Sequence, residues 1–215
     1  VVALHLNYNN REESSIEEMF LSEWCTFNKI KIYVKTIEDV RRNNTSRGEY
    51  EAYTKKKRFD FYKEVMDNED VDHVILGHHK DDIVENVFTN ICKARSLLDL
   101  GVMKEASIIE NVKILRPMLK LEKKEVYLYA YTNNIPFFKD TTPKWSVRGK
   151  YRNNVYPVLI DTFGENVKKN LINFNTQAEE WGEMITNCII EPFINSCDFQ
   201  KEDVAFHSVF NLSLC

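Results

Sequence analysis

The segment DHVILGHHKDDIVENVFTNICK, residues 72–93, predicts a strand that leads directly into a helix. Its apolar run at 74–76 is typical of a buried parallel strand, and Gly77 ends that run where backbone can approach a ligand closely. Apolar residues then recur with the period of a helix: Ile83, Val84, Val87, Phe88 and Ile91. In open α/β sheets, ligands bind where a strand ends and the next helix begins. The segment therefore predicts a fold class and the position of a site.

The same segment concentrates two histidines and three carboxylates within eight residues, namely His78, His79, Asp81, Asp82 and Glu85. Asp81 and Glu85 are four residues apart and Asp82 and Glu85 are three apart, so each pair shares a helix face. Acidic residues in a first turn also interact favourably with the helix dipole, so an ordinary helix start is the alternative interpretation. The two adjacent histidines favour a binding site.

Strands and helices alternate along most of the chain. Strands are predicted at 1–6, 31–34, 73–76 and 112–115, and helices at 14–28, 49–66, 122–133 and from 154 onward. Such alternation indicates βαβ units with a parallel sheet and right-handed crossovers. The predicted buried stripes are Ala52, Phe59, Tyr62 and Met66 in one helix, and Leu171, Phe174, Ala178, Trp181 and Ile185 in another. Residues 135–152 are predicted to be irregular.

Length and composition describe a globular protein with one main domain. The chain has 215 residues, 43% of them hydrophobic, and no apolar run long enough to span a bilayer. Five cysteines without a CxxC pair predict a reducing compartment and no cysteine-built metal site. With no signal peptide either, the expected location is the cytoplasm, including that of a virus-infected cell, or an organellar matrix. The segment 113–152 has ten basic and three acidic residues and is a candidate phosphate-contacting patch.

The six glycines form neither a GxGxxG motif nor a Walker-type loop, so dinucleotide and P-loop NTPase chemistry are unsupported. Four segments follow another pattern. EAYTKKKRF (51–59) resembles EAxARxxRY, and GHHKDDIVEN (77–86) resembles GHHxDDxxET. LRPML (115–119) resembles RPLL, and KDTTPKWSVRGKYRNNVYPVL (139–159) resembles a closing segment that contains RNxxR and P-x-L. Together they identify the chain as similar to the tRNA(Ile)-lysidine synthetase family of N-type PP-loop ATP pyrophosphatases, in a variant most like those of large DNA viruses and protists.

This resemblance implies a Rossmann-like, adenine nucleotide alpha hydrolase-like fold, in which helices flank a parallel sheet. It covers residues 1–160 as the PP-loop domain and leaves 161–215 as a helical extension. The implied activity uses ATP and Mg²⁺ to adenylate the wobble cytidine of a tRNA and then joins free L-lysine to the base. The implied partners are tRNA and L-lysine, and no membrane.

The resemblance also implies roles for individual residues. Asp82 and Glu85 match the acids thought to hold the lysine ammonium or magnesium, and Asp81 and Asp82 are the candidate Mg²⁺ ligands. Arg148 and Arg152 match the two arginines of RNxxR, whose guanidinium groups suit phosphate and the developing charge of adenylation. These four residues, Asp82, Glu85, Arg148 and Arg152, are the predicted catalytic set. The interpretation requires the acids and the arginines to converge on one pocket.

Further residues are predicted to bind substrate or nucleotide. His78, His79 and Asp81 are expected to line the same pocket, although each histidine is equally well explained as a turn residue with satisfied hydrogen bonds. Arg116 follows from the RPLL-like segment and Arg58 from the basic helix, where a surface position is the alternative for Arg58.

The chain also departs from the family pattern. The pyrophosphate-binding SGGxDS loop, which in the family precedes the first strand, is absent from this sequence, as is most of the carboxyl-terminal tRNA-binding region. Gly149 stands where the family has the Asn of RNxxR. We expect a segment trimmed from a larger protein, and a degenerate relative that binds nucleotide or RNA without catalysis is the alternative. A PP-loop tRNA thiolase is a further alternative, against which the absence of CxxC counts.

Overall fold

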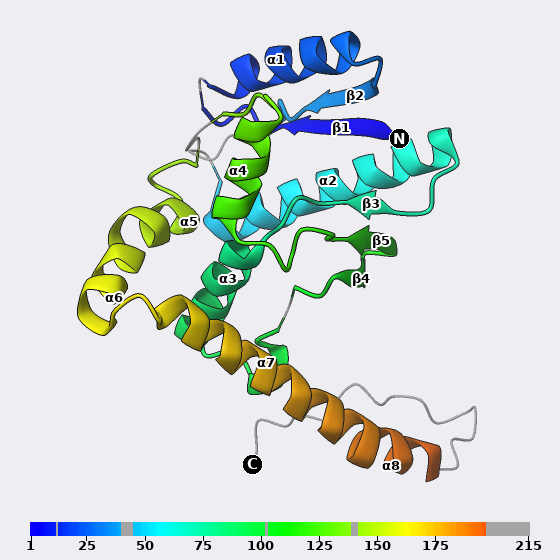
Figure 1. Ribbon diagram of the computed structural model, residues 1–215. Coiled ribbons are helices and arrows are strands. Elements are labelled where there is room, and N and C mark those ends of the chain that lie inside the picture. Colours follow the sequence, from blue (N-terminus) through cyan, green and yellow to red (C-terminus); the bar gives the residue numbers. More distant parts are fainter. Residues whose placement is uncertain (12, 40–44, 102, 139–141, 197–215) are drawn as a thin grey trace.

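The computed structural model describes residues 1–11, 13–39, 45–101, 103–138 and 142–196. It confirms the predicted α/β fold. The strands occupy the middle of the molecule, with α1 at one end and the long helix that runs from α7 into α8 at the other (Figure 1).

The first βαβ unit forms where the sequence predicts it. Strands β1 (Val2–Asn7) and β2 (Lys31–Thr36) pair in parallel, with Val2 opposite Lys31. Helix α1 (Glu13–Phe27) connects them and contacts both strands. A parallel pair needs such a crossover, because its strands run in the same direction.

A second sheet has the order β3-β5-β4. Strands β3 (Val74–Ile75) and β5 (Val112–Leu115) are parallel, as predicted. Strand β4 (Ala106–Ile109) pairs antiparallel with β5 and was not predicted. Glu110 and Asn111 connect β4 and β5, and both have positive φ (51° and 62°), which a tight two-residue hairpin requires.

Helix α2 (Arg47–Glu69) lies between the two sheets in sequence and packs against β5. Its Phe59 forms a buried cluster with strand residues Val74, Val112 and Ile114. Tyr62 and Met66 pack against this cluster, in agreement with the predicted stripe. The prediction that Ala52 is buried is wrong, because near the start of α2 the buried side chains are those of Tyr50 and Thr54.

Further helices follow the strands of the second sheet along the chain. Helix α3 (Lys80–Cys92) follows β3, a short 3₁₀ turn spans Leu97–Asp99, and α4 (Lys123–Thr132) follows β5. Helix α5 (Val147–Lys150) continues through a π-helical turn, η3 (Tyr151–Val155), into α6 (Tyr156–Phe163). The prediction of an irregular segment up to residue 152 is therefore wrong for 147–152, which are helical.

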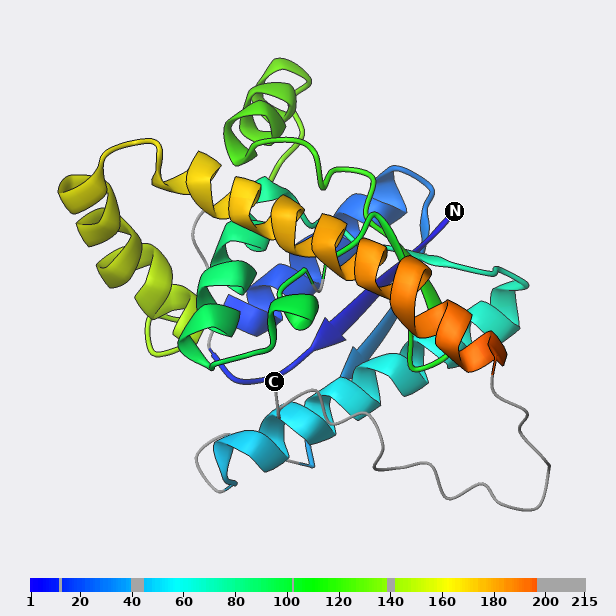
Figure 2. The same ribbon diagram turned by 90° about the horizontal axis from the view of Figure 1, so that it is seen from below.

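The carboxyl-terminal helix runs across the molecule (Figure 2). It consists of α7 (Val167–Ile185), the π turn η4 (Thr186–Ile190) and α8 (Glu191–Ser196). Ala178 is buried as predicted, but Phe174 and Trp181 are exposed, Trp181 by 57%. The stripe was misplaced because α7 turns the side of Val167, Asn175 and Ala178 inward. Within the described residues, no helix is both long and apolar enough to cross a membrane.

Candidate functional site at the start of α3

The first turn of α3 contains the predicted acidic residues in a constrained arrangement. His79 precedes the helix with an extended backbone, and its N–H donates to Asp82 Oδ2 at 3.0 Å. Asp82 thereby satisfies one of the amide groups that a helix start leaves without a backbone partner. Asp81 and Asp82 both lie in the first turn, where the helix dipole favours negative charge.

Asp82 and Glu85 meet the two predicted arginines. Arg148 donates from Nε to Glu85 Oε1 at 2.7 Å and from Nη2 to Asp82 Oδ1 at 3.0 Å. Arg152 donates from Nε to Glu85 Oε2 at 2.8 Å and from Nη2 to Asp82 Oδ1 at 3.3 Å. Two carboxylates are thus bridged by two guanidinium groups, so the acids and the arginines meet as expected, although only Glu85 and Arg152 of the four also line the neighbouring cavity. We call these four residues the acid–guanidinium network.

The network is buried on its acidic side only. Asp82 and Glu85 are 6% and 4% exposed. The side chain of Arg148 is 50% exposed and that of Arg152 is 27% exposed. Buried carboxylates without partners are very unfavourable, so the guanidinium groups neutralise charge that could not otherwise remain there. Arg148 also retains an exposed cationic surface, because in the described part of the chain its Nη1 makes no hydrogen bond.

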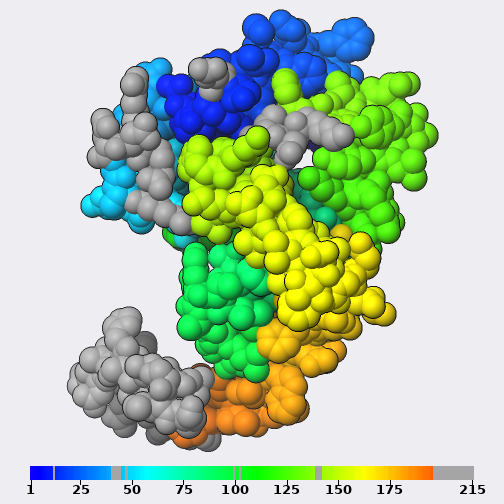
Figure 3. All heavy atoms as spheres, turned by 90° about the vertical axis from the view of Figure 1, so that its left-hand side faces the viewer, coloured from blue at the N-terminus to red at the C-terminus, as the bar shows by residue number. Residues whose placement is uncertain are grey.

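The helical segment α5–η3 positions both arginines. Arg148 and Arg152 are four residues apart and therefore share one helix face. Ser146 begins α5, because its Oγ accepts from the Gly149 N–H at 2.9 Å, and its own N–H donates to the Pro143 carbonyl at 2.9 Å. π-Helical turns within helices frequently occur at functional sites. Figure 3 shows the α5–α6 segment lying against α3 and the start of α7.

Gly149 is required by the close packing of this segment. A Cβ atom added at Gly149 would lie 2.2 Å from the backbone oxygen of Pro143. This position therefore excludes the Asn that the family has there. Residues 139–141 of the same motif lie outside the described residues, so the structure says nothing of them.

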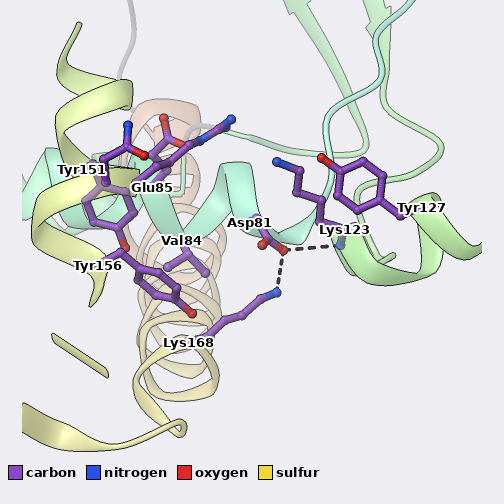
Figure 4. Close-up of a pocket in the computed structure, with 10 residues that line it drawn as sticks. Asp81, Val84, Glu85, Lys123, Tyr127, Tyr151, Tyr156 and Lys168 are labelled. Carbon is purple, nitrogen blue, oxygen red and sulfur yellow. Dashed lines mark hydrogen bonds and ion pairs between the residues drawn. The ribbon is translucent and has the colours of Figure 1, made fainter. Parts of the chain in front are cut away.

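A cavity of about 300 Å³ lies beside the network. Figure 4 shows Asp81 and Lys168 pointing toward one another, with Lys123 and Tyr127 on the α4 side and Tyr151 and Tyr156 on the α5–α6 side. The lining residues are Asp81, Val84, Glu85, Lys123, Tyr127, Tyr151, Arg152, Asn153, Tyr156 and Lys168. Burial raises the pKa of Tyr151, so its hydroxyl stays protonated at neutral pH. The cavity therefore combines aromatic walls with charges of both signs.

The sequence did not identify several of these lining residues. Lys123, Tyr127, Tyr156 and Lys168 come from α4, α6 and α7, which are brought to α3 only by the tertiary fold. Of these, Lys123 lay within the basic block 113–152, so charge distribution gave some signal for it. For Lys168 the sequence offered none.

Asp81 is held by Lys168 rather than by the arginines. Lys168 Nζ lies 2.5 Å from Asp81 Oδ1, and the backbone N–H of Lys123 approaches the same oxygen at 3.5 Å. Burial by itself raises the pKa of Asp81, but the hydrogen bond and charge of Lys168 outweigh burial and leave the pKa below its ordinary value.

Replacing Lys168 with methionine is expected to reduce stability at neutral pH by about 1 kcal/mol or less, because water screens this partly exposed pair. A carboxyl group whose pKa is lowered by folding stabilises the protein above its unfolded pKa, and this contribution is lost as the pH falls through the folded pKa. The difference between wild type and Lys168→Met should therefore be constant above about pH 5 and shrink as the pH falls below about 4, the ordinary pKa of an aspartate. Urea unfolding at several pH values measures it. Lys169→Met, which changes the exposed neighbouring lysine, is the control. A stability difference between wild type and Lys168→Met that stays constant with pH would contradict the pairing of Lys168 with Asp81.

The remaining predicted residues are not all in one place. His79 Nδ1 lies 3.4 Å from Asp82 Oδ2, and His78 contacts Arg116. Arg116 is 4% exposed and does not line the cavity. Arg58 lines a separate cavity of about 450 Å³ with Tyr8, Asn10, Tyr50, Glu51, Thr54 and Lys55.

The predicted magnesium site does not fit this arrangement. Asp81 is directed to Lys168, whereas Asp82 is directed to the two arginines and the His79 N–H. Both carboxylates are therefore already paired with cations or N–H donors. Over the part of the chain that the structure describes, no group of three or more His, Cys, Asp or Glu residues is arranged to hold a metal ion.

The class of protein follows from the fold, the site and a family comparison. The sequence model of the PP-loop domain family matches residues 1–159. The chain therefore belongs to the PP-loop domain family, as the sequence motifs indicated.

Individual relatives make the resemblance more specific. The chain is 27% identical over 201 residues to a tRNA(Ile)-lysidine synthase of Staphylococcus epidermidis, which covers 91% of this chain and 45% of that protein. It is 30% identical over 158 residues to a tRNA(Ile)-lysidine synthase of Mycoplasmopsis pulmonis, which covers 72% of this chain and 54% of that protein. The chain thus spans about half the length of these relatives.

A solved structure supports the fold alone. The U34-tRNA thiolase NcsA from Methanococcus maripaludis, determined with its 4Fe-4S cluster, superposes with a TM-score of 0.61 at 19% identity. The superposition covers 85% of this chain and 61% of the thiolase chain.

Proposed function

We propose that this chain is the core of a tRNA(Ile)-lysidine synthase-like ligase, which activates a cytidine of tRNA with ATP and joins the base to free L-lysine. One observation carries the proposal: the acid–guanidinium network lies beside a cavity that contains a carboxylate paired with a primary ammonium. The names of the relatives support the substrate class. A tRNA-modifying activity is expected where tRNA is found, in the cytoplasm or an organellar matrix.

The proposed reaction has two steps. In the first, O2 of the base attacks the α-phosphate of ATP, and pyrophosphate leaves. In the second, the amine of lysine attacks C2 of the base, the C2–O2 bond breaks, AMP leaves with the oxygen, and the amine loses a proton. Both steps develop or move negative charge on phosphate oxygens, which guanidinium groups stabilise. We assign this role to Arg148, because its side chain is half exposed while its orientation is fixed by Glu85 and Asp82.

The cavity suits the amine substrate. Asp81 is paired with the primary ammonium of Lys168 at 2.5 Å, and this pairing supports the choice of a lysine-type cation as its ligand. The aromatic rings of Tyr127, Tyr151 and Tyr156 line the same space and suit the aliphatic part of a lysine side chain. We infer that free L-lysine binds in this cavity, with its ammonium replacing that of Lys168 at Asp81, because both oxygens of Glu85 are already bound by the arginines. No step is assigned to a magnesium ion, because no group of three or more His, Cys, Asp or Glu residues in the described part of the chain is arranged to hold one.

The experiment follows pyrophosphate and AMP in mixtures of the chain, ATP and a tRNA(Ile) transcript, with and without L-lysine. Pyrophosphate release is expected to depend on tRNA, and omission of lysine is expected to lower AMP formation at least tenfold. Radiolabelled lysine should appear in the tRNA. A tRNA whose wobble cytidine is replaced by uridine is the matched control.

Two outcomes contradict the proposal. Sulfur incorporation from a sulfur donor, with no dependence on lysine, would favour the thiolase alternative. The absence of both pyrophosphate release and nucleotide binding would favour a non-catalytic RNA-binding role.

A further inference from the structure

Arg116 makes contacts that a nucleotide-binding arginine would not need. Its Nη1 donates to the Lys104 carbonyl at 2.8 Å and to Ser107 Oγ at 2.9 Å. Its Nε donates to His78 Nδ1 at 3.2 Å. Arg116 is 4% exposed, and its guanidinium group is fixed by Lys104 and Ser107 and faces the ring nitrogen of His78. These contacts place Arg116 to orient the ring of His78.

The contact determines which nitrogen of His78 carries the proton. A guanidinium group has five N–H donors and no acceptor, so the ring nitrogen that faces it must be unprotonated. A neutral imidazole with an unprotonated Nδ1 carries its proton on Nε2. Within the described residues Nε2 has no hydrogen-bond partner, and it is not among the buried polar atoms that lack one. His78 thus presents an N–H donor that no part of the described structure uses.

The surrounding charges keep His78 neutral. Burial is the largest cause that lowers the pKa of His78 below its ordinary value, and the positive charges of Arg116, Arg148 and Arg58 act in the same direction. Only Asp82 opposes them, and Asp82 is itself neutralised by the acid–guanidinium network. At neutral pH the side chain is therefore an imidazole and not an imidazolium.

We propose that Arg116 is a positioning residue that holds His78 as the neutral Nε2–H tautomer, so that Nε2–H is the donor to an anionic oxygen of the substrate at the carboxyl end of β3. The assignment of that oxygen to a phosphate rests on the proposed function, whereas the tautomer does not. Directing a fixed dipole at developing charge is an effective way to stabilise a transition state, because nothing needs to reorient during the reaction.

The tautomer is measured on the unmodified chain, labelled with ¹⁵N in histidine, by long-range ¹H–¹⁵N correlation at about pH 7.5. His78 is expected to show a protonated Nε2 and an unprotonated Nδ1, and its resonances are identified by their loss in His78→Gln. His73 is an internal control with the proton on the other ring nitrogen. Its Nδ1 lies 2.5 Å from the Asp72 carboxylate and must therefore carry a proton. A protonated Nδ1 at His78, or a mixture of tautomers, overturns the proposal.

Arg116→Lys tests the role of Arg116 itself. A lysine cannot reproduce the three-way contact, so the pKa of His78 should rise and the second tautomer should appear. An unchanged His78 spectrum in a folded Arg116→Lys protein would show that Arg116 does not set the tautomer. If this variant does not fold, the measurement on the unmodified chain still decides the tautomer.

Two substitutions at His78 test the use of the donor. The amide nitrogen of Gln lies close to the position of Nε2, and the amide of Asn lies close to that of Nδ1. His78→Gln is therefore expected to keep AMP formation within about tenfold of wild type, whereas His78→Asn should lower it about 100-fold. Equal losses in both variants would refute the donor role. Failure of the wild type to form AMP would instead contradict the proposed function, and the tautomer measurement would be unaffected.

Discussion

Replacing Arg152 with methionine is expected to lower lysine-dependent AMP formation at least 100-fold and to reduce the free energy of unfolding by about 2–3 kcal/mol. Methionine keeps much of the volume but removes the charge that faces Glu85 Oε2 and Asp82 Oδ1. Two carboxylates that are almost fully buried would then share the single guanidinium group of Arg148. Urea unfolding gives the stability, and the AMP assay gives the turnover.

Arg95→Met is the matched control, because Arg95 is exposed and makes no ion pair with the described residues. It should change stability by no more than about 0.5 kcal/mol and leave AMP formation unchanged. Equal effects of Arg95→Met and Arg152→Met would show that loss of any positive charge, and not loss of the network, causes the change.

Gly149→Ala is expected to destabilise the chain by about 3 kcal/mol, at the upper end for an inserted methyl group. The added Cβ would meet the Pro143 backbone oxygen at 2.2 Å, and backbone cannot move aside as a flexible side chain can. To relieve this clash, α5 must shift away from the turn at 143–146, and the shift would carry Arg148 away from Glu85. A large loss of AMP formation should therefore accompany the loss of stability.

Gly48→Ala is the control for this substitution. Gly48 is also a helical glycine, in α2, but an added Cβ would meet nothing within 4 Å. Alanine there should stabilise the chain by about 0.4–1 kcal/mol, because glycine loses more backbone entropy on folding. If Gly149→Ala left the free energy of unfolding unchanged, the backbone oxygen of Pro143 would have to lie farther than 2.2 Å from the added Cβ.

The acidic half of the site was predictable because it is local in sequence. A short apolar strand, a glycine and an acidic first turn occupy fewer than fifteen residues, so spacing alone placed Asp82 and Glu85 on one helix face. The arginine half was predicted through the family motif, and the structure confirms that it meets the acids.

The irregular segment was mispredicted for a physical reason. Pro136 and Pro143 were read as signals of a loop that extends to residue 152. Pro143 does lie outside any helix, but α5 begins only four residues later, at Val147. Gly149 lies within this helix because of close packing, although glycine normally weakens helices.

The cavity could not be predicted, because its residues are separated by up to 87 positions along the chain. Lys168 and Asp81 meet only after α7 has packed against α3. The orientation of α7 was likewise misjudged, since apolar periodicity alone suggested that Phe174 and Trp181 face inward. Arg116 shows the same limit: its motif suggested a ligand contact, but its partners are His78 and the unpredicted β4–β5 hairpin.

The most direct test of the account is a double-mutant cycle on Glu85 and Arg152, using Glu85→Gln, Arg152→Met and the double variant, with stabilities from urea unfolding. If the two side chains form a buried ion pair at 2.8 Å, the double variant should be less destabilised than the sum of the single variants by about 1.5–3 kcal/mol. Single-variant effects that add within about 0.5 kcal/mol would show that the acids of α3 and the arginines after residue 147 do not form one site.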